Sequence, residues 1–129
     1  MRFNSERVIP QIHALHRRLA GVYIECLPYQ EFITRYDRID TLYYLDPPYW
    51  NCENDYGKGI FGKADFDELA KLLKGIKGKF ILSINDVPEI RQIFTGFHIK
   101  EVQTTYTTGT QSGKAAAELL VSNVDLSRL

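Results

Sequence analysis

The chain has 129 residues, of which 44% are hydrophobic and 25% charged, and its 16 basic residues balance 16 acidic ones. This composition is typical of one globular domain and excludes global disorder. No run approaches the roughly 20 apolar residues of a membrane-spanning helix, and the N-terminus lacks the apolar core of a signal peptide. We therefore expect a cytoplasmic protein. Zero net charge argues against a free-standing nucleic-acid binder, but not against an enzyme that contacts nucleic acid locally.

Cysteine and histidine placement predicts no metal site. Cys26 and Cys52 lie far apart and lack the paired spacing of zinc ligands, so we interpret them as reduced thiols. His13 and His16 are three residues apart and fit one helical face, but no third ligand lies nearby. Surface histidines are the more frequent outcome of such a pattern.

The first part of the chain predicts two helices and a strand. Apolar residues recur with the helical period over residues 8–19, and Gly21 is a natural stop for this helix. Pro10 predicts a kinked start or a start near that residue. Residues 22–26 then form a β-favouring run that we interpret as a short strand. Residues 28–35 suit a short helix.

The middle of the chain repeats the order of strand and helix. Residues 41–45 are a continuous apolar run, typical of a strand covered on both faces. A polar loop over residues 50–63 follows. Asp65 is the expected N-cap of the next helix, and Glu68 completes a pattern similar to a capping box. Residues 79–84 predict a second buried strand.

The last third predicts a helix and a hairpin. Asp86 and Glu89 frame a second capping pattern, and the helix after it ends at Gly96. Residues 97–106 and 115–123 are strand-like, and the segment between them is too short for a parallel crossover. The chain is therefore expected to form an α/β sheet, mostly parallel, with a C-terminal antiparallel hairpin.

The sequence Asp46-Pro47-Pro48-Tyr49 follows a predicted buried strand and is the most informative segment. Ligands of open parallel sheets bind outside the carboxyl ends of the strands. An acid at that position, next to proline carbonyls without competing N–H donors, suits an exocyclic amine. The aromatic ring offers a flat face on which a planar base can stack. A strand-terminating acid in a proline turn is the alternative, and the full four-residue signature favours function over it.

This segment carries a resemblance to a known family. Residues 42–50, Leu-Tyr-Tyr-Leu-Asp-Pro-Pro-Tyr-Trp, resemble the signature of the Dam-like D12 class of DNA adenine-N6 methyltransferases. Residues 22–29, 80–86 and 118–123 are similar to further strands of that family. The resemblance implies a Rossmann-like methyltransferase sheet, S-adenosylmethionine as methyl donor, and adenine in DNA as the target.

The resemblance also implies roles for single residues. Asp46 and Pro47 would accept hydrogen bonds from the N6 amine, Pro48 would fix the turn, and Tyr49 would stack on the flipped base. The amine would then attack the sulfonium methyl directly, without a metal or a covalent intermediate. Asp46 and Tyr29 are the expected cofactor-binding residues, with Tyr29 bordering the adenine of the cofactor.

The loop after the signature holds candidate DNA contacts. Trp50, Lys58 and Lys63 lie in or beside it and are expected to contact the DNA backbone or a flanking base. A solvated loop is an equally good interpretation of these three. Residues 57–62 match the pattern G-x-G-x-x-G, but they follow a polar loop and no acid lies about 20 residues further on. Loop flexibility explains these glycines better than a nucleotide site.

Two parts of the family pattern have no counterpart in the chain: the glycine-rich Phe-x-Gly-x-Gly cofactor turn and the target-recognition domain. Residues 1–129 are thus expected to be the C-terminal part of the catalytic domain. In the family, two further strands separate the strands that correspond to residues 22–26 and 41–45. We expect the chain to close this gap by re-pairing its own strands or by forming a homodimer at the exposed edge.

Three functions remain open from the sequence. The first is a DNA adenine-N6 methyltransferase fragment from a phage or restriction–modification setting. The second is an inactive remnant that acts only as a folded or oligomerising module. The third is an amine methyltransferase that acts on RNA or protein.

Overall fold

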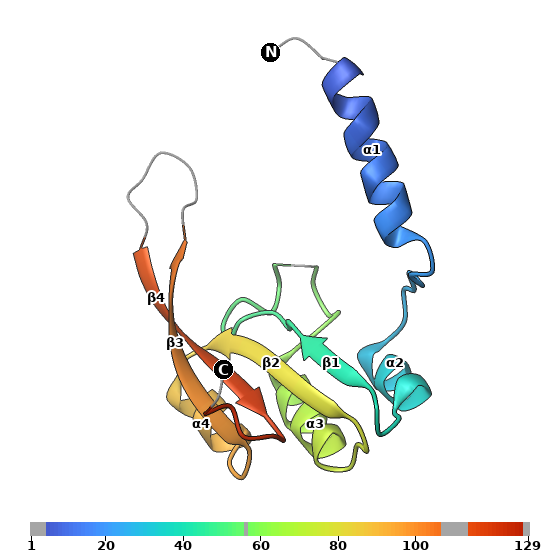
Figure 1. Cartoon of the computed structure of the whole chain (residues 1–129). Coiled ribbons are helices and arrows are strands. Elements are labelled where there is room, and N and C mark those ends of the chain that lie inside the picture. The colour runs from blue at the N-terminus through green and yellow to red at the C-terminus, as the bar shows by residue number, and fades with distance from the viewer. Residues whose placement is uncertain (1–4, 56, 107–113, 128–129) are drawn as a thin grey trace.

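A computed structural model of the chain describes residues 5–55, 57–106 and 114–127 (Figure 1). Between residues 29 and 106 the helices and strands alternate, as the sequence predicts, and a second strand follows residue 106. The described elements are α1 (Ser5–Leu19), α2 (Tyr29–Tyr36), β1 (Leu42–Leu45), α3 (Lys63–Lys74), β2 (Lys79–Asn85), α4 (Pro88–Ile93), β3 (His98–Tyr106) and β4 (Lys114–Ser122).

The strands form one mixed sheet in the order β1-β2-β4-β3. Strands β1 and β2 are parallel, whereas β4 is antiparallel to both β2 and β3. The antiparallel pairing of β3 with β4 confirms the predicted hairpin, and residues 107–113 of its turn lie outside the described part. The expectation of a mostly parallel sheet is wrong, because β1 and β2 make the only parallel pair among the described strands.

Residues 22–26 are not a strand, which corrects the sequence prediction. They run as an irregular segment from α1 to α2, away from the sheet (Figure 1). Tyr23 and Ile24 are 87% and 83% exposed. The Tyr36 hydroxyl donates a hydrogen bond to the Glu25 carboxylate at 2.8 Å, which ties the segment to α2. A β-favouring run forms a strand only where a neighbour pairs with its backbone groups, and no strand of the described part of the chain pairs with this run.

Helix α1 projects away from the sheet (Figure 1). It begins at Ser5 and runs through Pro10, so the expected start near that proline is wrong, while its end before Gly21 is confirmed. The apolar stripe Ile9, Ile12 and Leu15 is 52%, 57% and 56% exposed. Among the described residues, no helix is long and apolar enough to cross a membrane.

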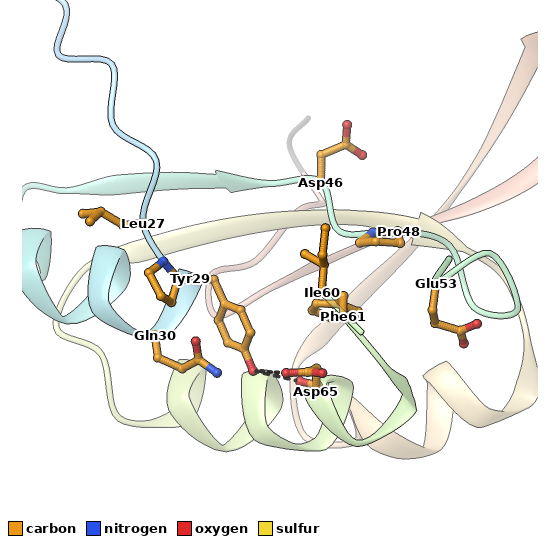
Figure 2. A pocket seen from close by; sticks show the side chains of 10 residues that line it. Leu27, Tyr29, Gln30, Asp46, Pro48, Glu53, Ile60, Phe61 and Asp65 are labelled. Carbon is orange, nitrogen blue, oxygen red and sulfur yellow. Dashed lines mark hydrogen bonds between the residues drawn. The ribbon is translucent and has the colours of Figure 1, made fainter. Parts of the chain in front are cut away.

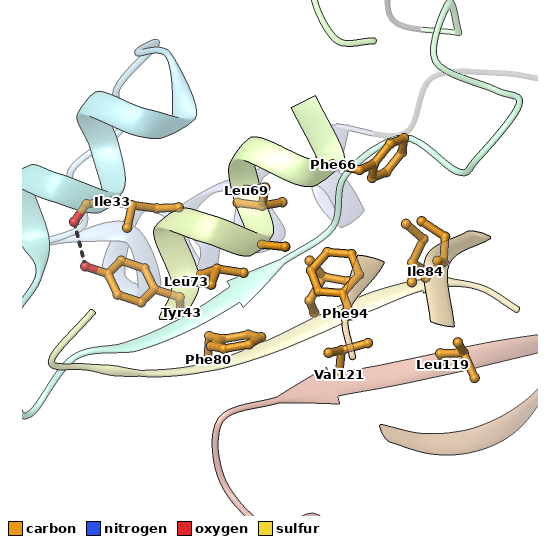
Figure 3. Close-up of a cluster of buried hydrophobic side chains, with 13 residues drawn as sticks. Ile33, Tyr43, Phe66, Leu69, Leu73, Phe80, Ile84, Phe94, Leu119 and Val121 are labelled. Carbon is orange, nitrogen blue, oxygen red and sulfur yellow. Dashed lines mark hydrogen bonds between the residues drawn. The ribbon is translucent and has the colours of Figure 1, made fainter. Parts of the chain in front are cut away.

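The hydrophobic core lies between helices α3 and α4 and one face of the sheet (Figure 3). Alternate residues of β2 point into it, and Phe80, Leu82 and Ile84 are fully buried. The helices contribute the facing side chains, which include Phe66, Leu69 and Leu73 of α3 and Phe94 at the end of α4. Leu119 and Val121 of β4 lie beside the β2 residues on the same face of the sheet. This core holds the carboxyl ends of β1 and β2 at one edge of the sheet.

Both expected helix caps differ in detail from the prediction. Gly62 is the N-cap of α3, and Asp65, the third residue of the helix, accepts the Gly62 N–H at 2.8 Å. Val87 is the N-cap of α4, where the prediction placed Asp86. The Asp86 carboxylate instead pairs with the Arg91 guanidinium through two contacts of 2.7 Å. The sequence spacing therefore predicted approximately where the two helices begin, but not which hydrogen-bond donors the carboxylates of Asp65 and Asp86 bind.

Strand β1 is an open edge covered on one face only. Tyr43 is buried, and its hydroxyl donates to the Ile33 carbonyl at 2.8 Å. Leu42 and Tyr44 point to the other face and are 63% and 68% exposed. The expected cover on both faces is therefore wrong. The predicted re-pairing also does not occur, because β1 pairs only with β2 within the described residues.

Asp37 links the turn before β1 to the turn before β2 through hydrogen bonds. Its carboxylate accepts the backbone N–H groups of Lys77 and Gly78, each at 2.9 Å from Oδ1. A Cβ atom on Gly78 would lie only 2.9 Å from the Thr41 carbonyl oxygen, so the two turns approach as closely as glycine allows. The backbone donors lower the pKa of Asp37 below its ordinary value of 3.8.

Stability should therefore depend on pH through Asp37. Its lowered pKa means that its contribution is complete above pH 3.8 and is lost as the pH falls through the folded value. We expect the difference in unfolding free energy between wild type and Asp37→Asn to shrink on acidification below that pH. Urea unfolding at several pH values measures this difference. Asp40→Asn, which removes an exposed charge nearby, is the control, and a pH-independent difference for Asp37→Asn would contradict the prediction.

Candidate active site

The Asp46–Tyr49 motif leaves the sheet at the carboxyl end of β1. Leu45, the last residue of β1, pairs with Leu82 of the parallel strand β2, so both strands run toward the same edge. Asp46 is exposed, and the three residues after it are partly buried. The motif thus occupies the edge where open parallel pairs bind their ligands.

A cavity of about 360 Å³ lies beside the motif (Figure 2). Its volume is within the range of small-molecule sites. Tyr29 and Asp46, which the sequence analysis selected as cofactor-binding residues, both line it, and so does Pro48. In Figure 2 the Asp46 carboxylate points away from the Tyr29–Asp65 pair across the cavity. The further lining residues are Leu27, Pro28, Gln30, Glu53, Ile60, Phe61 and Asp65.

Tyr29 is held in place at one side of this cavity. Its hydroxyl donates to Asp65 Oδ1 at 3.2 Å (Figure 2), and its ring centroid lies 5.9 Å from that of Phe61. Burial, followed by the charge of Asp65, raises the pKa of Tyr29 well above its usual range. The phenol is protonated at neutral pH, as an ordinary tyrosine is, and acts here as a hydrogen-bond donor to Asp65.

The end of the motif is fixed by the two central strands. The Trp50 backbone N–H donates to Asn85 Oδ1 at 2.8 Å, and the Asn85 side-chain amide donates back to the Trp50 carbonyl at 3.3 Å. The Tyr49 hydroxyl donates to the Glu118 carboxylate. Asn85 of β2 and Glu118 of β4 are themselves register partners in the sheet. Tyr49 therefore turns toward β4, whereas Asp46 and Pro48 line the cavity.

Two of the three candidate DNA contacts lie together. Lys63 Nζ lies 4.7 Å from the centroid of the Trp50 ring, a cation–π geometry. The Trp50 ring also packs on Phe66, with centroids 5.2 Å apart. Lys58 is exposed in the loop before α3. The tryptophan is thus partly a packing residue, and an exposed lysine lies beside its ring.

Several residues of this site were not predicted from the sequence. Asp65 appeared only as a helix cap, and Glu118 only as part of a strand. Ile60 and Phe61 lie in the loop that was attributed to flexibility, yet both line the cavity. An apolar pair inside a polar loop and a lone acid in an apolar strand were the available signals. The described residues contain no group of three side chains suited to hold a metal ion.

The fold and the site together define an α/β protein with a ligand cavity beside an acid–proline motif, an arrangement suited to amine modification. A model of the D12 class of N6 adenine-specific DNA methyltransferases matches residues 2–108, and the chain belongs to this family. It is also 30% identical over 84 residues to the type II methyltransferase M.CviBI of Paramecium bursaria Chlorella virus NC1A. The match covers 65% of this chain but only 32% of the relative, so the chain spans about a third of it.

Proposed function

We propose that residues 1–129 are the C-terminal catalytic part of a site-specific DNA adenine-N6 methyltransferase. It would transfer a methyl group from S-adenosylmethionine to the N6 amine of a flipped adenine. The observation that carries this proposal is the position of Asp46, at the carboxyl end of β1 and on the rim of a cavity that also holds Tyr29. The relative is a type II methyltransferase of a Chlorella virus, which supports a viral or restriction–modification setting and does not point to a phage in particular.

The cavity suits the chemistry of S-adenosylmethionine. The residues that line it include the acids Asp46, Glu53 and Asp65 and, within the described part of the chain, no basic residue, so the local charge is negative and favours a cationic ligand. Ile60 and Phe61 give it an apolar wall for a flat nucleoside, and Tyr29 borders that wall. S-adenosylmethionine supplies an electrophilic methyl group on a positively charged sulfur when it is bound.

The motif residues would prepare the amine. An aromatic amine is a weak nucleophile because its lone pair is delocalised into the ring. Hydrogen bonds from N6 to the Asp46 carboxylate and the Pro47 carbonyl favour a pyramidal nitrogen with a localised lone pair. Pro48 restricts the turn, and the Tyr49 ring stacks on the flipped base. Catalysis then rests on positioning and electrostatics.

The loop and the start of α3 would contact the DNA. Lys63 and Trp50 offer a cation and an aromatic ring at one place, and Lys58 offers a second cation from the loop. Lysines of this kind bind phosphates without reading sequence, whereas an aromatic ring stacks on a base next to the target. We infer that these residues hold the flanking DNA and do not select the recognition site.

Methyl transfer by the chain tests the proposed function. Calorimetry with S-adenosylmethionine and analysis of N6-methyladenine in DNA after incubation with labelled cofactor are the two measurements. Cofactor binding and labelled adenine are expected. Label in RNA or protein with none in DNA would establish the other amine methyltransferase. No binding at millimolar cofactor would contradict activity of this chain on its own and leave its family membership unchanged.

A role as an oligomerising module has an observation of its own. The open edge of β1 exposes Leu42 and Tyr44, and exposed apolar edges favour pairing with another strand. We propose that a second copy of the chain pairs there, with or without catalysis. Sedimentation that gives a monomer up to high micromolar concentration would count against this homodimer.

A further inference from the structure

Glu118 is a buried acid on β4 beside the Asp46–Tyr49 motif. Only 5% of the surface of Glu118 is exposed. The Tyr49 hydroxyl donates to Glu118 Oε1, and the Ser83 hydroxyl lies 3.4 Å from Oε2. A buried carboxylate is unfavourable unless hydrogen bonds compensate for the loss of water. Sheet pairing alone does not require an acid here, since Leu120, the next residue on the same face of this strand, is apolar.

The register of the sheet places Glu118 opposite Asn85. These two residues hold consecutive residues of the motif segment, because Asn85 binds the Trp50 backbone and Glu118 binds the Tyr49 hydroxyl. The Tyr49 side chain is thus held at both ends, at its backbone through the next residue and at its hydroxyl. Two strands of the rigid sheet supply both anchors, which is the arrangement needed to keep a ring in one orientation.

We propose that Glu118 is a positioning residue that fixes the Tyr49 ring for stacking on the target base. The assignment of the base to Tyr49 rests on the proposed function, whereas the restraint on the ring does not. Glu118 acts through the Tyr49 hydroxyl and does not touch the reacting amine. A ring held in one orientation keeps the stacked base aligned with the methyl donor, so its benefit falls on the bound complex.

The restraint is tested by carbon NMR on the chain labelled at the ζ-carbon of tyrosine. The chain has eight tyrosines, and the signal lost in Tyr49→Phe identifies Tyr49. Glu118→Ala should move this signal to the position of exposed tyrosines, and Glu118→Gln should move it less, since an amide oxygen still accepts the hydroxyl. Ser122→Ala is the matched control. Ser122 is buried on the same strand and bonds the Phe80 carbonyl, so its loss should leave the Tyr49 signal unmoved.

The purpose of the restraint is tested by methyl-transfer rates. Glu118→Ala and Tyr49→Phe should each lower kcat by about 10- to 100-fold, the loss expected for one hydrogen bond to a charged acceptor. The double variant should be no slower than the slower single variant, and Glu118→Gln should recover most of the rate. Cofactor affinity should be unchanged.

The two measurements separate the possible failures. An unmoved Tyr49 signal in Glu118→Ala, or fold-losses of kcat that simply multiply in the double variant, overturns the positioning role. A wild-type chain that transfers no methyl group overturns the proposed function instead. In that case the NMR result alone decides whether Glu118 fixes the ring.

Discussion

Asp46→Asn is expected to lower kcat for adenine methylation by about 10²–10³-fold, the usual loss when one preorganised electrostatic contact is removed. Asparagine keeps the shape and one acceptor oxygen but loses the negative charge, and hydrogen bonds to charged acceptors are about twice as strong as neutral ones. Its amide N–H₂ group also presents donors to an amine that itself donates. The loss should fall on kcat more than on the KM for DNA, because Asp46 acts on the nitrogen as it reacts.

Single-turnover transfer of labelled methyl from S-adenosylmethionine measures this effect directly. Asp55→Asn is the matched control, since Asp55 is an exposed acid of the loop that follows the motif and does not line the cavity. Asp46 is exposed, so Asp46→Asn should leave the unfolding free energy within about 0.5 kcal/mol of wild type. An Asp46→Asn rate within threefold of wild type would remove Asp46 from its proposed role.

The fold was predictable where its signals are local. The apolar run of β2 and the helical spacing in α3 lie within one element each, and both elements form as expected. Residues 22–26 carry an equally good β-favouring run, yet they form no strand because the partner they need is not beside them. Strand formation depends on a neighbour that the local pattern does not contain. Because residues 22–26 do not join the sheet, the sheet contains fewer parallel strands than predicted.

The same distinction between local and long-range signals applies to the residues of the site. Asp46 and Tyr49 were found because the motif is contiguous in sequence. Glu118 meets Tyr49 across 69 positions of the chain, and Asp65 meets Tyr29 across 36, so no spacing rule points to either pair. Only the register of β4 against β2 brings Glu118 to the motif. Such contacts need the tertiary structure.

Phe66 connects the core to the loop of the site, and its removal should affect both. Phe66 is fully buried on α3, and its ring contacts Trp50 at 5.2 Å and Phe61 at 4.9 Å between centroids. Phe66→Ala is expected to lower the free energy of unfolding by about 3–5 kcal/mol, the usual range for a buried phenylalanine. Phe61 lines the cavity and Trp50 follows the motif, so both should also lose their support.

The two effects separate in a comparison with Phe94→Ala. Phe94 is equally buried, but its aromatic neighbour is Phe97, with centroids 6.1 Å apart. Urea unfolding should show a similar loss for both variants. Trp50 is the single tryptophan of the chain, so its fluorescence reports on the loop alone. Under folding conditions its emission should shift to the red in Phe66→Ala and not in Phe94→Ala. An equal shift in both variants would mean that the loop depends on overall stability and not on the Phe66 ring.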